Sequence, residues 1–147
     1  MRPVGAAVHP TTLHQLCHAI KCVVRAIWFV HHQNWLHTDI RWSNIVKLAD
    51  DNWFVIDCYN ACEIGSNQAI ETGGTHGLTG PWSPIDDRRQ IVNNLINRVQ
   101  RGNNAQGVVH AFSLISNAII VGQHVATIEQ ALNAIITENA DFKIVIL

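Results

Sequence analysis

Apolar residues recur at steps of three and four along several stretches of the chain, which predicts amphipathic helices. The first stretch runs from Thr12 to about His32, with Thr11 or Thr12 as its N-cap. A second covers Asp87–Val99, and Gly102 with its neighbouring asparagines is expected to end it.

Two further apolar helices are expected in the last third of the chain. One covers Val108–Val121 and ends at Gly122. The other covers Thr127–Thr137, where Thr127 and the glutamine three residues later have the form of a capping box. The final apolar run, Lys143–Leu147, either tucks into the core or marks a sequence that has been cut short.

Two short apolar runs near the middle of the chain predict a β-hairpin. They cover residues 45–48 and 53–56 and are joined by turn-type residues 49–52. Residues 57–84 are rich in glycine and are expected to form a long irregular segment. The expected fold class is therefore mainly α (α+β), with one small hairpin.

Composition indicates one folded domain and excludes several classes of partner. The 147 residues are 48% hydrophobic and 14% charged, with a net charge of −1, so neither disorder nor binding to nucleic acid or a membrane is indicated. The absence of a long apolar run or signal pattern predicts an intracellular protein, cytoplasmic or nuclear. The four cysteines do not have zinc or redox spacing and are expected to be reduced, small apolar residues: Cys17, Cys22, Cys58 and Cys62.

Candidate chemistry is concentrated between the first helix and the end of the hairpin. Asp39 and Asn44 lie at the two ends of a short loop, and Asp57 ends the strand that folds back beside it. Carboxylate and amide oxygens are the ligands that Mg²⁺ prefers, and another carboxylate can accept a proton from a hydroxyl. These three side chains are therefore expected to converge, within about 10 Å of one another, the scale on which shared ions and a reacting phosphate operate.

This order of elements resembles the C-lobe of the protein-kinase-like superfamily. Residues 37–44 fit the catalytic loop H-x-D-x-x-x-x-N, and Asp57 with the next two residues stands where kinases have Asp-Phe-Gly. Asp87 resembles the aspartate at the start of the central C-lobe helix. The resemblance covers residues 12–101 of a single truncated domain, leaves 102–147 as additional helices, and is nearest to divergent fungal kinase-like proteins.

The resemblance implies phosphoryl transfer from ATP to a Ser or Thr hydroxyl of a protein substrate, with Mg²⁺ and ATP as cofactors. Asp39 would be the catalytic base, and Arg41 would contact the transferring phosphoryl group. Asn44 and Asp57 would bind Mg²⁺ and thereby hold the nucleotide. The expected structural supports are His37 and Asp87.

Several departures from the kinase pattern predict weak or absent activity. Thr38 replaces the arginine that would pair with an activation-loop phosphate, and Ala-Pro-Glu is absent. No glycine-rich loop or nucleotide-binding lysine precedes Thr11, so an absent N-lobe is expected. The chain alone should bind ATP weakly and transfer phosphate negligibly. Its uncovered C-lobe surface would favour a partner protein or self-association.

Other interpretations of the same residues stay open. The three polar side chains at 39, 44 and 57 could be turn caps, or they could persist in an inactive, pseudokinase-like binding module. A small-molecule phosphotransferase of the aminoglycoside or choline kinase type has a similar loop. Outside the loop, His31 and His32 are expected at a solvated helix end, and Arg88 on a solvated helix face.

Overall fold

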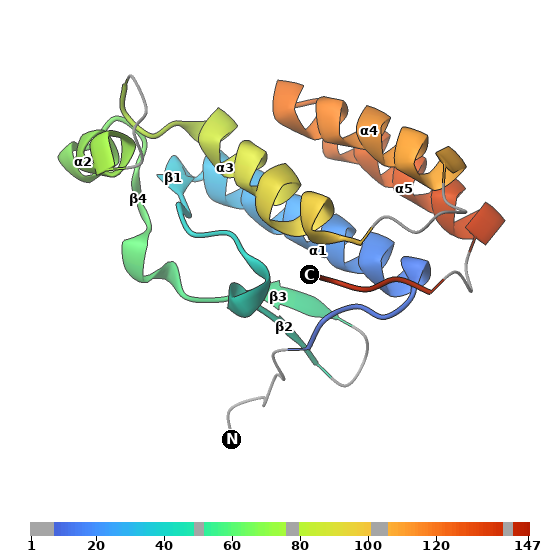
Figure 1. The fold of residues 1–147 in the computed structure, drawn as a ribbon. Coiled ribbons are helices and arrows are strands. Elements are labelled where there is room, and N and C mark those ends of the chain that lie inside the picture. Colours follow the sequence, from blue (N-terminus) through green and yellow to red (C-terminus); the bar gives the residue numbers. More distant parts are fainter. Residues whose placement is uncertain (1–7, 49–51, 76–79, 101–105, 140–142) are drawn as a thin grey trace.

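A computed structural model describes residues 8–48, 52–75, 80–100, 106–139 and 143–147. The described residues form a mainly helical fold with two small antiparallel sheets, which confirms the mainly α (α+β) class (Figure 1). The α-helices are α1 (Leu13–His32), α2 (Asn67–Thr75), α3 (Pro84–Gln90), α4 (Gln106–Val121) and α5 (Val125–Asn139). The strands are β1 (Trp35–Leu36), β2 (Ile45–Lys47), β3 (Trp53–Val55) and β4 (Cys62–Glu63).

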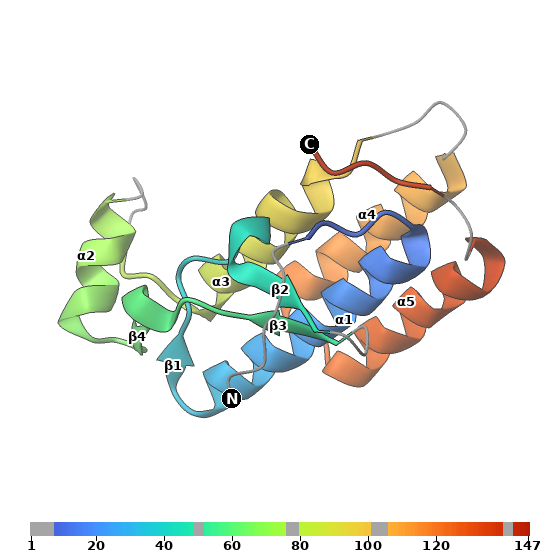
Figure 2. The same ribbon diagram turned by 90° about the horizontal axis from the view of Figure 1, so that it is seen from below.

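Helix α1 forms the centre of the fold, as its long apolar stripe predicts. The Thr12 side chain accepts a hydrogen bond from the Gln15 amide at 3.2 Å, so Thr12 is the N-cap. Figures 1 and 2 show α1 with α5 along one side and α3 along another. Strand β3 also contacts α1, so the helix supports the hairpin that follows the loop at residues 37–44.

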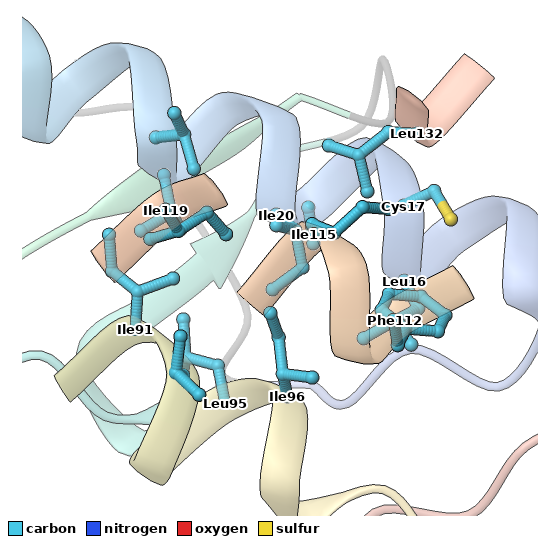
Figure 3. Packing of buried hydrophobic residues seen from close by; sticks show 14 of the residues in the cluster. Leu16, Cys17, Ile20, Ile91, Leu95, Ile96, Phe112, Ile115, Ile119 and Leu132 are labelled. Carbon is cyan, nitrogen blue, oxygen red and sulfur yellow. The ribbon is translucent and has the colours of Figure 1, made fainter. Parts of the chain in front are cut away.

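Buried side chains from α1, the segment after α3, α4 and α5 make up the main core (Figure 3). Ile20 on α1, Leu132 on α5 and Leu95 in the segment after α3 are fully buried in this core. Full burial of a side chain of this size stabilises the fold by about 1.5–3 kcal/mol. A second, smaller cluster lies at the α2 end of the molecule and consists of Leu36, Cys62, Ala69 and Trp82.

The predicted hairpin is confirmed, and a second strand pair accompanies it. Strands β2 and β3 pair antiparallel with Ile45 opposite Val55, while the turn at 49–51 lies outside the described residues. Strands β1 and β4 also pair antiparallel, with Leu36 opposite Cys62. Two-residue strands are too short to produce a detectable alternation of apolar and polar residues, so the sequence did not reveal this pair.

The prediction of an irregular segment over 57–84 is wrong in part. This region contains β4, a short helical turn η2 (Cys58–Asn60), and helix α2. Ser66 starts α2 by accepting a hydrogen bond from the Ala69 amide at 3.2 Å. The glycines that suggested a loop include Gly73, where a Cβ atom would lie 2.1 Å from the Gly80 carbonyl oxygen. Glycine is needed there because two backbone segments meet closely, while the backbone itself is helical.

The helix predicted from Asp87 begins three residues earlier and changes its geometry on the way. Ser83 is the N-cap of α3, and its amide and hydroxyl both donate to the Asp86 carboxylate in a capping box. After Gln90 the chain continues as a π-helical segment, η3 (Ile91–Leu95), and a 3-10 turn, η4 (Ile96–Arg98). The predicted terminator Gly102 lies outside the described residues.

Helix α4 ends as expected, but α5 does not start as expected. Gly122 has φ 76°, a left-handed conformation that glycine adopts readily at a helix end. Helix α5 begins at Val125, so Thr127 is not its N-cap. Instead, the Thr127 amide donates to the His124 carbonyl at 3.0 Å, and the His124 ring accepts from the Ala126 amide. Histidine is rare as a cap, and the capping-box pattern at Thr127 therefore misled the prediction.

The final residues of the chain pack against the fold, which was one of the two expectations for the apolar run 143–147. Lys143 forms a β-bridge with Thr12, and Ile146 forms one with Val99. Ile144, between these bridges, is buried in the main core. The tail thus ties the start of α1 to the end of the helical segment that follows α3 (Figure 1).

The cysteines are free thiols, in agreement with expectation, but they are not all small core residues. Cys17 and Cys62 are buried, Cys22 is half-buried and Cys58 is exposed. Cys58 is exposed because it begins the turn η2 beyond strand β3, where the chain leaves the core. Within the described ranges, no helix is both long enough and apolar enough to cross a membrane.

Candidate functional site

The Asp87 carboxylate fixes the backbone of the loop that carries the candidate chemistry. Its Oδ2 accepts a hydrogen bond from the His37 amide at 2.8 Å, and its Oδ1 accepts one from the Thr38 amide at 2.9 Å. Asp87 is fully buried, and Thr38 has φ 74°, which is uncommon for a β-branched residue. The two bonds stabilise this strained turn.

Two further donors reach the same carboxylate from other parts of the chain. The Trp82 indole donates to Asp87 Oδ1 at 2.9 Å, and the His31 ring lies 2.8 Å from Oδ2 through Nε2. His31 was expected at a solvated helix end, but its side chain is only 12% exposed because α1 ends against α3. Burial alone would raise the pKa of Asp87, yet the bonds from His31, Trp82 and the two loop amides outweigh it and hold that pKa below its usual range.

The lowered pKa of Asp87 predicts a specific loss of stability in acid. In the unfolded chain an aspartate titrates at about 3.9, so the contribution of Asp87 is fully present above that pH and is lost as the pH falls through the lower folded value. We expect the urea midpoint of the wild type to fall more steeply below about pH 4 than that of Asp87→Asn. Parallel acid profiles for the two proteins would contradict this assignment.

Two amide side chains on the same helical segment complete the support of the loop. Gln90 accepts from the Ile40 amide at 2.9 Å and donates to the Thr38 carbonyl at 3.0 Å, and Asn94 donates to the Ile40 carbonyl at 2.8 Å. Sequence analysis missed both residues. Their spacing of three and then four from Asp87 puts all three on one helix face, and this polar stripe was a readable signal.

His37 connects the loop to the end of the hairpin. Its Nδ1 accepts from the Asp39 amide at 3.2 Å, and its Nε2 lies 3.1 Å from the Ile56 carbonyl oxygen. A carbonyl can only accept, so Nε2 carries the proton, and a neutral ring satisfies both bonds. His37 is buried, and both of its ring nitrogens have a partner.

Asp39, Arg41 and Asn44 contact one another in this loop. The Arg41 Nε lies 3.2 Å from Asp39 Oδ1, and the Asn44 amide nitrogen donates to the Asp39 carbonyl and Oδ2 at 2.8 and 3.0 Å. The Asp39 side chain is 26% exposed, whereas Asn44 is buried. The Asp39 carboxylate is therefore held by two donors while staying within reach of a molecule in solution.

Asp57 lies where the second hairpin strand passes the loop. The Ile56 amide donates to the Asn44 carbonyl at 2.8 Å, so the backbone just before Asp57 is bonded directly to the loop. Asp57 has φ 62°, is exposed, and accepts from the Tyr59 amide at 3.4 Å. Its backbone is thus placed beside Asn44, while its carboxylate turns toward its own η2 turn.

The donor set is compatible with a hard cation held jointly with a ligand. Among the described residues no three His, Cys, Asp or Glu side chains are grouped so that they could bind a metal by themselves. The Asn44 amide nitrogen makes both bonds to Asp39, and the Asn44 Oδ1 accepts no hydrogen bond from the part of the chain that is described. Mg²⁺ commonly takes one or two protein oxygens and completes its shell with water and phosphate oxygens.

A comparison with curated proteins gives a partial similarity. Crinkler effector protein 8 of Phytophthora infestans is 38% identical over 64 residues, which are 43% of this chain. The same residues make up 11% of that protein, so the chain spans only a small part of its length. No family model matches the chain.

Proposed function

We propose that this chain carries the catalytic-loop lobe of a protein-kinase-like phosphotransferase. In this proposal Asp39 accepts the proton of a protein Ser or Thr hydroxyl, and Arg41 contacts the transferring phosphoryl group. Asn44 and Asp57 hold Mg²⁺ against the phosphates of ATP. His37 and Asp87 keep the loop in place without touching the substrate.

The observation that carries the proposal is the set of bonds through His37. One ring nitrogen accepts from the Asp39 amide and the other donates to the carbonyl of Ile56, which directly precedes Asp57. The candidate base and the candidate metal ligand are thus coupled through one buried side chain. A loop built only from turn caps does not require such a link, whereas phosphoryl transfer depends on fixed positions for base and metal.

When bound, Mg²⁺ would supply positive charge to the phosphates, and the remaining work belongs to the side chains of this loop. The ion pair with Arg41 orients the Asp39 carboxylate, and the amide of Asn44 fixes its second oxygen. A hydroxyl presented to Asp39 would find an oriented acceptor that is partly open to solvent.

Paramagnetic broadening by Mn²⁺ tests the metal ligands without requiring turnover. We expect Mn²⁺ with ADP to broaden the amide signals of residues 39–44 and 56–58 in ¹⁵N-labelled protein, because these residues surround Asn44 and Asp57. Asp57→Asn should remove most of this broadening. Asparagine tolerates the left-handed backbone at this position, so the variant keeps the local fold.

Glu63→Gln is the matched control, since it neutralises an exposed carboxylate on β4. In this control, Mn²⁺ with ADP should broaden the same amide signals as in the wild type. Broadening that is spread evenly over acidic surface residues, or that is unchanged in Asp57→Asn, would contradict the assignment of Asp57 to the metal.

A specific observation favours a second candidate, a catalytically inactive binding module. The Asp39 carboxylate already has Arg41 and Asn44 as partners, and the Asp57 carboxylate bonds to the Tyr59 amide. A site with these internal contacts is stable without a nucleotide. Absence of site-specific Mn²⁺ broadening would favour this module, with a protein as its partner. The name of the similar Phytophthora protein, an effector, states no chemistry that separates the two candidates.

A further inference from the structure

A small cavity with two arginines in its lining opens beside the loop of Asp39. Its volume is about 240 Å³. The lining includes two arginines and one histidine, no aspartate or glutamate, and Leu147, the last residue of the given sequence. The lining residues are His9, Arg41, Trp42, Asn94, Arg98 and Leu147.

Hydrogen bonds fix several of the residues that line this cavity. The Trp42 indole donates to the Leu95 carbonyl at 3.2 Å and is buried, and Asn94 is tied to the Ile40 carbonyl. The backbone of Arg98 is fixed by the Leu147 amide, which donates to its carbonyl at 2.7 Å. Because these lining residues are already fixed, binding a ligand would cost little conformational entropy in them.

The charges around the cavity are only partly compensated. Arg41 is paired with Asp39 at 3.2 Å. The Arg98 side chain is exposed and makes no hydrogen bond or ion pair with any residue that the structure describes. A guanidinium with open donors binds carboxylate or phosphate oxygens through two parallel bonds, so an oxyanion is the group that fits this lining.

The size of the cavity indicates one side chain. Pockets for drug-sized ligands begin at about 300 Å³, so this space is too small for a nucleotide. We propose that the cavity binds an acidic side chain of a protein substrate, a glutamate or a phosphoserine, next to the hydroxyl presented to Asp39. The inference rests on the proposed function, because Arg41 belongs to both the loop and the cavity. The proposed substrates are therefore proteins with an acidic residue near the reacting hydroxyl.

Fluorescence anisotropy with short labelled peptides tests the proposal in the absence of ATP and metal. One peptide has a central serine flanked by glutamates, a second has phosphoserines in those places, and matched peptides have glutamine or lysine. The protein is assayed as it is and with Gly-Ser added after Leu147, which moves the terminal carboxylate two residues further along the chain, and both forms should show the same preference. We expect at least one acidic peptide to bind at least about tenfold more tightly than the glutamine peptide, and more weakly as salt is raised. The tighter acidic peptide identifies the preferred oxyanion.

The variant Arg98→Gln should weaken binding of the acidic peptide about tenfold, and Arg98→Glu should abolish it. Arg89→Gln makes the same chemical change on an exposed part of α3, outside the cavity, and should bind like the wild type. Equal binding of acidic and glutamine peptides, or equal losses in Arg98→Gln and Arg89→Gln, would overturn the proposal. Since the assay contains no nucleotide, a failure of the Mn²⁺ experiment leaves this result unaffected, and the reverse also holds.

Discussion

Replacing Asp87 with alanine should destabilise the protein by roughly 2–4 kcal/mol in denaturant melts. The physical reason is the number of donors that would lose their acceptor. The amides of His37 and Thr38, the indole of Trp82 and the ring of His31 all reach this one carboxylate, which is fully buried. Buried donors without partners retain their full desolvation penalty.

Two companion variants make the Asp87 result specific. Asp87→Asn keeps one acceptor oxygen, so it should lose less stability than the alanine variant. Glu63→Ala removes an exposed carboxylate and should change the free energy of unfolding by no more than about 0.5 kcal/mol. If Asp87→Ala also loses less than about 0.5 kcal/mol, the carboxylate does not support the loop, and the proposed site loses its scaffold.

Alanine substitutions at two adjacent glycines of α2 should change the stability of the protein in opposite directions. Gly73→Ala places a methyl group 2.1 Å from the Gly80 carbonyl oxygen and 3.0 Å from the Trp82 amide, and both obstacles are backbone atoms. Overpacking of this kind destabilises by about 1–3 kcal/mol. The same substitution at Gly74 meets nothing within 4 Å, so it should stabilise the helix by about 0.5–1 kcal/mol.

The effect of Gly73→Ala should extend beyond α2. The Trp82 amide donates to the Ala69 carbonyl at 2.8 Å, and its indole is one of the donors to Asp87. A displaced Trp82 should therefore show a red-shifted tryptophan emission that Gly74→Ala does not show. Two variants with the same thermal midpoint would mean that α2 and residues 80–82 are not in contact.

The parts of the fold that sequence predicted are those whose signal is local and long. Helix α1 repeats its apolar step over five turns, and the pair β2–β3 consists of two apolar runs around a turn. Helix α2 was not predicted because its glycines suggested a loop. Gly73 is needed because residues 80–82 pack against it, and the residues next to Gly73 in sequence give no sign of this contact. The π-helical segment Ile91–Leu95 likewise depends on packing and has no distinct composition.

The candidate site was predictable where residues follow a fixed spacing along the chain. Asp39 and Asn44 share one loop, and the structure brings them into direct contact. Asp87 was found because it lies at the start of a helix, yet its partner His31 was not, since 56 positions separate them. The orientation of the Asp57 carboxylate also escaped prediction, because it follows from the left-handed backbone of a single residue.

The partners of α1 have a consequence for the synthesis of the protein. Helix α5, which covers one side of α1, and Ile144, which packs against the same core, follow α1 far along the sequence, so they are synthesised well after it. At about 5–20 residues per second, the apolar face of α1 stays uncovered on the ribosome for several seconds. During this time the emerging chain exposes an apolar helix face of the kind that chaperones bind, and the core closes only after α5 and Ile144 have left the ribosome.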